Sequence, residues 1–231
     1  MLFFSDKICY IFSMKKTFLQ FNKAFTLAEV LITLVIIGVI AAVTIPTVIN
    51  NTKKQEYVSK LKKVYSTLSA ATNKILFEYG NPNASIGGWC DTVENMAAMY
   101  KKHIQISRDC GFSTGCIENT AYIGFNGSAT DWQLDQHNWA YKLVMADGAQ
   151  LYISTVSDSC SDNNFGGQNV CGHIFVDING SKKPNKFGKD FFLFELREDG
   201  LHPTGCETDT CSGVYAYGCA CKVIRENAMN Y

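Results

Sequence analysis

One long apolar block dominates the N-terminal part of the chain. Residues 25–49 contain a single charged side chain, Glu29. As an α-helix this block would extend about 37 Å at about 1.5 Å per residue, enough to cross a hydrocarbon core of about 30 Å. A secretory signal peptide has a shorter apolar core that ends in a small-residue cleavage site. Here the block is longer and the small residue, Ala24, precedes it, so the pattern favours a membrane-spanning helix over a signal peptide.

After Pro46 the apolar positions become periodic. They recur at steps of four and three residues, at Tyr57, Leu61, Val64, Leu68, Ala71, Ile75 and Tyr79. This spacing defines one face of an α-helix, and most of the lysines lie off that face. The Gly-Asn-Pro-Asn segment at 80–83 ends the helix. Residues 50–80 are therefore predicted as the amphipathic half of the same helix, which could bend at Gly38 and Pro46.

A short helix and a hairpin are predicted in the region that follows. The sequence Asp-Thr-Val-Glu at 91–94 is typical of a helix N-cap with an acidic first turn, and it predicts a helix to about His103. Asp147-Gly148 is a hairpin signal between strands predicted at 139–145 and 150–155.

Three more β-rich segments complete the predicted head. Residues 173–178 and 191–197 are typical of strands, and residues 214–224 are predicted as a last strand with Cys219 and Cys221 on one face. We therefore expect an α+β fold. Its long N-terminal α-helix, membrane-spanning in the first half, would pack on a C-terminal antiparallel β-sheet head with disulfide-stapled loops.

The cysteines indicate an oxidising compartment. Nine of the ten lie in polar, Gly-rich stretches of the head, at Cys90, Cys110, Cys116, Cys160, Cys171, Cys206, Cys211, Cys219 and Cys221. The head contains no CxxC pair and its histidines are scattered, which favours disulfides over a zinc site. Because nine is odd, at least one cysteine is free or pairs between chains. Local spacing suggests the pairs Cys160–Cys171 and Cys206–Cys211.

The carboxylate of Glu29 lies inside the predicted membrane segment. An unpaired charge in hydrocarbon costs several kcal/mol, so such a residue indicates a function. If the chain were cut after Ala24, the new amine of Phe25 would lie one helical turn from Glu29 and could neutralise it, in the same chain or in a neighbour.

The sequence Lys-Ala-Phe-Thr-Leu-Ala-Glu-Val-Leu-Ile at 23–32, followed by the apolar run and Pro46, resembles the class III signal of type IV pilins and type II secretion pseudopilins. The resemblance is strong over 23–79. It implies cleavage by a prepilin peptidase between Ala24 and Phe25, and methylation of the new N-terminus at Phe25. It also implies assembly roles for Glu29, fifth in the mature chain, and for Pro46, the twenty-second. The family usually has Gly where this chain has Ala24.

The resemblance also implies the partners and the location. Residues 1–24 would be a leader. A start at Met14 is the alternative, and it would leave out Cys9. Residues 25–49 would span the bacterial inner membrane once, residues 50–80 would continue the helix, and residues 81–231 would form an extracytoplasmic head. The expected partners are other pilin subunits in a filament, the prepilin peptidase, the inner-membrane assembly platform and the lipid bilayer. The filament would lie in the periplasm or at the cell surface.

One loop of the head is a candidate calcium site. Asp177, Asn179 and Asp190 supply oxygen ligands around Gly180, as a calcium loop does, and some type II secretion pseudopilins bind calcium in their heads. Four lysines crowd this loop and a late chelating Glu is missing. The alternative is a plain turn in which Asn179-Gly180 supplies the positive φ.

Two functional alternatives remain beside a structural filament subunit. The first is a minor tip pilin that binds DNA, a surface or a secreted substrate, with Trp89, Trp132 and Trp139 either lining its site or packing in the core. The second is an anchored extracytoplasmic enzyme. No nucleophile elbow, P-loop or dinucleotide fingerprint is present, so we expect no enzyme and no required cofactor. The 21 basic and 21 acidic side chains give no indication of nucleic-acid binding.

Overall fold

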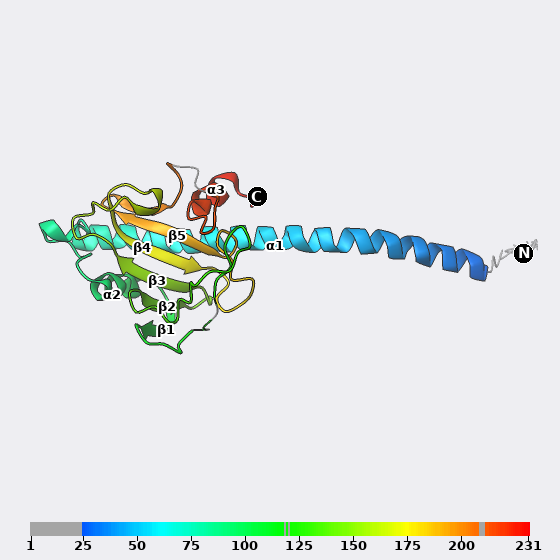
Figure 1. Cartoon of the computed structure of the whole chain (residues 1–231), viewed down its shortest axis with the longest axis horizontal. Coiled ribbons are helices and arrows are strands. Elements are labelled where there is room, and N and C mark those ends of the chain that lie inside the picture. The colour runs from blue at the N-terminus through cyan, green and yellow to red at the C-terminus, as the bar shows by residue number, and fades with distance from the viewer. Residues whose placement is uncertain (1–24, 118, 120, 208–210) are drawn as a thin grey trace, which may run out of the picture. The chain divides into compact units, whose positions relative to one another are not determined.

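The computed structural model describes residues 25–231 except 118, 120 and 208–210 (Figure 1). The leader, with Cys9, Met14 and Ala24, lies outside the described residues. The chain divides into two compact units, Met1–Thr47 and Val48–Tyr231, which are described separately. Helix α1 (Leu27–Tyr79) belongs in part to each.

The described part of the first unit is the apolar start of α1. Every side chain from 25 to 47 except Ala41 is exposed, and Pro46 lies inside the helix. The hydroxyls of Thr33 and Thr44 donate to the carbonyls of Val30 and Ile40, each at 2.9 Å. Each of these hydroxyls is therefore hydrogen-bonded within the helix, as an apolar environment requires. By length and composition, this is the one helix among the described residues that could cross a membrane, as the apolar block predicts.

The second unit is built on a six-stranded antiparallel sheet in which strands that follow one another in sequence are neighbours (Figure 1). The strands are β1 (Ile106–Gly111), β2 (Tyr141–Met145), β3 (Gln150–Thr155), β4 (Val170–Asp177), β5 (Phe191–Arg197) and β6 (Gly200–Pro203). The remaining elements are α2 (Val93–His103), α3 (Cys219–Glu226) and the 3₁₀ turns η1 (Ala84–Ile86) and η2 (Asn164–Gly166). The sheet and the long helix confirm the predicted α+β class.

The sheet is covered on both faces. Ile174 and Val176 of β4 belong to a core shared with the second half of α1 and with α2. Phe175, between them, points to the opposite face, where an aromatic core includes Phe187 and Phe191. Because side chains alternate along a strand, a strand covered on both faces is apolar at nearly every position. The whole of β4 is accordingly buried.

The amphipathic half of α1 supplies one layer of the first core. The predicted face is buried from Tyr57 to Ile75, whereas Tyr79 is 43% exposed. The side chain of Thr92 accepts the backbone N–H of Asn95 at 3.1 Å and caps α2, as the capping sequence predicts. At the hairpin between β2 and β3, Gly148 has φ +90°, a conformation that glycine adopts without strain.

Two predictions of secondary structure need correction, and two edge strands have no counterpart in the prediction. Residues 214–224 are not a strand: they form turns and then helix α3. The buried positions Cys219, Ala220 and Val223 follow a helical spacing, whereas the Cys-Ala-Cys alternation resembles the period of a strand. The first predicted strand of the hairpin begins at Tyr141 and not at 139. The edge strands β1 and β6 were not predicted, because β1 is polar and largely exposed and β6 has only four residues.

Four disulfides staple the head. They join Cys110 to Cys116, Cys160 to Cys171, Cys206 to Cys221 and Cys211 to Cys219. The suggested pair Cys206–Cys211 is wrong, because α3 brings Cys221 and Cys219 to these two residues. Among the described residues Cys90 is the free cysteine. It is buried, and burial raises the pKa of its thiol to about 12.

Candidate functional site

The first candidate site is the start of α1. The backbone N–H and the hydroxyl of Thr26 both donate to Glu29 Oε2 at 2.9 Å, and the Glu29 N–H donates to Thr26 Oγ1 at 3.2 Å. This reciprocal arrangement is a capping box, which satisfies donors that a helix N-terminus leaves free. Phe25, just before it, is 82% exposed. The Thr-x-x-Glu signature at 26–29 could have revealed the cap in the sequence.

The second candidate site is the loop between β4 and β5. Asp177 and Asp190 are both fully buried there. Asn179 connects them, because its backbone N–H donates to Asp177 Oδ1 at 3.1 Å and its Nδ2 donates to Asp190 Oδ2 at 3.1 Å. Burial raises the pKa of both carboxyls, that of Asp190 to about 6, and the charge of Asp190 raises the pKa of Asp177 further.

The oxygen atoms of this loop fit a hard cation in part. Asn179 Oδ1 and Asn185 Oδ1 are buried, and neither has a hydrogen-bond partner in the described chain. Unpartnered amide oxygens beside two carboxylates are the ligands that calcium takes. Lys182, Lys183 and Lys189 are exposed. The carboxylates number only two, and no group of three His, Cys, Asp or Glu side chains suited to a metal occurs among the described residues.

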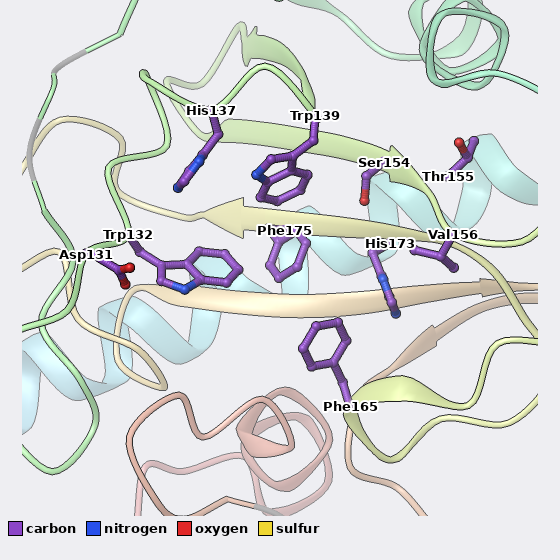
Figure 2. A pocket seen from close by; sticks show the side chains of 10 residues that line it. All are labelled: Asp131, Trp132, His137, Trp139, Ser154, Thr155, Val156, Phe165, His173 and Phe175. Atoms are coloured by element: carbon purple, nitrogen blue, oxygen red, sulfur yellow. The ribbon is translucent and has the colours of Figure 1, made fainter.

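The third candidate site is a pocket of about 380 Å³ on the aromatic face of the sheet (Figure 2). It is lined by Asp131, Trp132, His137, Trp139, Ser154, Thr155, Val156, Phe165, His173 and Phe175. Ser154 of β3 and His173 of β4 are directly opposed across the two strands. The tryptophans come from the loop before β2, and Phe165 comes from η2, within the loop closed by Cys160–Cys171.

The pocket resolves the question of the three tryptophans. Trp89 is 6% exposed and packs in the core, where its Nε1–H donates to the carbonyl of Gly80 at 3.1 Å. Trp132 and Trp139 line the pocket with their ring centroids 6.0 Å apart, and Trp132 also packs against the aromatic core. Sequence reasoning missed His173 and the other strand residues of the pocket. The run Trp132–His137–Trp139 was the one local signal, since three large rings lie within eight residues.

Comparison with known proteins finds a match at the N-terminus. Residues 20–45 match the family described as the prokaryotic N-terminal methylation motif. This segment contains the Thr26–Glu29 capping box and most of the apolar start of α1. Neither the curated proteins nor the solved structures contain a match to the chain.

Proposed function

We propose that this chain, a type IV pilin-like or pseudopilin precursor, is cut by a prepilin peptidase before Phe25 and becomes a structural subunit of a helical filament. The methylation motif at 20–45 is the prepilin-cleavage signal of type IV pilins and pseudopilins, and this match carries the proposal. The motif points to a structural class of protein that is not known for catalysis.

The physical chemistry of α1 supports the proposal. Its exposed apolar start needs lipid or the same segment of other subunits around it, because water cannot solvate such a surface at low cost. After cleavage, the amine of Phe25 would neutralise the carboxylate of Glu29 in the same chain or in a neighbour. The charge would then be paired in the bilayer and in the filament. Pilin subunits, the peptidase and the inner-membrane assembly platform are the partners in this proposal.

Within this class, two roles fit the head. The first is a subunit along the shaft of a type II secretion pseudopilus or a type IV pilus. The second is a minor subunit at the tip that binds a ligand, and the aromatic pocket favours it. The abundance of the protein relative to other subunits, and its position along the filament, distinguish the two roles.

Processing is tested by mass spectrometry of the N-terminus. We expect a mature chain that begins at methylated Phe25 when the protein is expressed with a prepilin peptidase, and an intact leader when the peptidase is absent. A matched control replaces Ala24 by the bulky Trp, which should block the cut. A cut after the apolar block, near 44–50, or a leader that stays intact with the peptidase present, would show that the chain is not a pilin precursor.

We further propose that the loop containing Asp177, Asn179 and Asp190 binds calcium. The two unpartnered amide oxygens support this proposal, together with the repulsion between the buried carboxylates. The carboxylates, the amide oxygen of Asn179 and the neighbouring Asn185 would hold the ion. Calcium would neutralise the pair and so replace the proton that their raised pKa values favour.

The calcium proposal predicts a pH-dependent stability. The pKa of Asp190 is about 6 in the folded protein and ordinarily 3.8. Without calcium, the stability that the protonated pair contributes is therefore full below about pH 4 and is lost as the pH rises through about 6. At 100 times its Kd, calcium adds about 2.7 kcal/mol. We expect the unfolding temperature at pH 7 to rise by about 5–10 °C over that in EDTA, and to rise much less at pH 4.5.

Asp177→Asn is the test variant for this site. An amide can still accept the Asn179 N–H, and it can donate to the Tyr122 hydroxyl, which now donates to Asp177 Oδ2 at 2.6 Å. We expect the variant to fold, to lose the response to calcium and to depend less on pH. Asp158→Asn, at an exposed site, is the control. An equal calcium response in both variants, or none in the natural protein, would contradict the proposal.

A further inference from the structure

The pocket on the aromatic face combines apolar walls with free polar groups. Trp132, Trp139 and Phe175 form one wall, with the ring centroid of Phe175 at 5.4 Å from that of Trp132 and 5.7 Å from that of Trp139. Phe165 and His173, whose centroids are 5.0 Å apart, form the other (Figure 2). Trp139 is 38% exposed, so its ring remains accessible at the mouth.

His173 is the polar group that most needs a partner. Its side chain is 1% exposed, and its Nε2 is buried with no hydrogen-bond partner in the described part of the chain. A buried polar nitrogen without a partner is costly. Burial lowers the pKa of His173 to about 4, so the ring is neutral at pH 7 and offers one donor and one acceptor.

Further hydrogen-bonding groups lie around His173. Ser154 of β3, directly opposite His173, supplies a hydroxyl, and Asp131 supplies a carboxylate near Trp132. The indole N–H groups of the two pocket tryptophans donate to no other described residue, unlike that of Trp89. The pocket thus offers donors and acceptors beside flat apolar rings.

The charges of the pocket exclude one large class of ligand. Among the described residues that line the pocket, Asp131 is the one that is acidic, and none is Lys or Arg. A phosphate, a carboxylate or an acidic sugar would therefore meet a negative charge without a cation to balance it. A neutral or a positively charged ligand is compatible with this lining.

We propose that this pocket binds a neutral sugar ring, either free or as one residue of a glycan. A sugar ring has an apolar C–H face that stacks on an indole, and hydroxyls around its rim that both donate and accept hydrogen bonds. The pocket presents both kinds of surface in one cavity, whose volume suits a small ligand. A quaternary ammonium ion would fit the aromatic walls, but it would leave His173 and Ser154 without partners. The sugar therefore fits the whole lining and the cation only part of it.

The test is saturation-transfer NMR and indole-fluorescence titration of the full-length protein. The apolar start of α1 requires a detergent. We choose a polyoxyethylene detergent because its head group contains neither a sugar nor a quaternary ammonium that could compete with the probes. The neutral probes are methyl β-glucoside, methyl β-galactoside and N-acetylglucosamine, and the comparison probes are glucuronic acid and choline. We expect at least one neutral probe to bind with a millimolar Kd, about −4 kcal/mol, and the acidic and cationic probes to give no signal.

Three variants locate the binding. Trp139→Ala should raise the Kd for the neutral probe about five-fold or more, since stacking contacts contribute about 1 kcal/mol or more. Asp131→Asn should keep sugar binding to within a few-fold, because an amide still makes hydrogen bonds. Phe77→Ala removes an exposed aromatic outside the pocket, 92% exposed on α1, and should change nothing.

Two outcomes would overturn the proposal. In the first, choline binds and the sugars do not, and the choline signal is lost in both Trp139→Ala and Asp131→Asn. The pocket would then be a cation site. In the second, no neutral probe binds at a concentration 50-fold above the expected Kd, or Trp139→Ala binds the sugar as tightly as the natural protein does. Because all measurements use unassembled protein, none of these outcomes depends on whether the chain enters a filament.

Discussion

Glu29→Gln should be cleaved and methylated like the natural chain but enter filaments at least about ten-fold less, since losing one partner of a buried ion pair costs about 3–5 kcal/mol. In the natural subunit the Phe25 amine and the Glu29 carboxylate would neutralise each other in lipid. Glutamine leaves the amine without a counter-charge. This prediction rests on the proposed filament role.

Glutamine is the right replacement because of the capping box. Thr26 donates both its backbone N–H and its hydroxyl to Glu29 Oε2, and the side-chain carbonyl of Gln can accept the same bonds. The variant therefore removes the charge and keeps the helix cap. Thr26→Val is the matched control, because it keeps the charge and removes the hydroxyl, at a cost of about 1 kcal/mol to the cap.

The measurement is the ratio of sheared filament to total subunit, by quantitative immunoblot, in cells that contain the peptidase. Mass spectrometry of the same samples reports cleavage and methylation. Normal assembly of Glu29→Gln would show that the charge has no role in assembly. A loss of assembly in Thr26→Val as deep as in Glu29→Gln would show that the helix cap is what matters.

Replacing Cys206 and Cys221 together by Ser should lower the free energy of unfolding by about 3 kcal/mol, the chain-entropy value for a closed loop of about 15 residues. The two cysteines are 15 residues apart. Their bridge closes the segment that contains Tyr215 and Tyr217, whose rings pack on Phe187 with centroids at 5.3 and 6.0 Å. Loss of this bridge should loosen the packing of the aromatic core and also increase the conformational entropy of the unfolded chain.

Cys90→Ala is the matched control for this substitution. Cys90 is buried and forms no bridge with another described cysteine, so we expect a loss of about 1 kcal/mol, from the small volume removed. Urea unfolding followed by tryptophan fluorescence gives both values. Peptide mapping without reduction should link Cys206 to Cys221 and Cys211 to Cys219. A Cys206–Cys211 peptide, or equal losses in the two proteins, would contradict the structure of this segment.

Features that depend on short-range patterns could be predicted from the sequence alone. Three local patterns occur in the structure as predicted. They are the apolar run after Phe25, the helical period from Tyr57 to Ile75 and the cap at Thr92. The N-terminal signal is also local, because a peptidase reads a contiguous segment. For this reason the methylation motif at 20–45 could be predicted from the sequence.

Long-range packing, which local sequence patterns do not show, sets which residues meet across the head. The pairing of Cys206 with Cys221 depends on a helix that forms where Cys219 and Cys221 resemble a strand. The pocket places Trp139, Phe165 and His173 in one cavity, although they come from two loops and a strand. Such contacts depend on strand order and register, which join residues distant in sequence, and no local period records them. The burial that leaves His173 Nε2 without a partner likewise results from packing, and composition could not have indicated it.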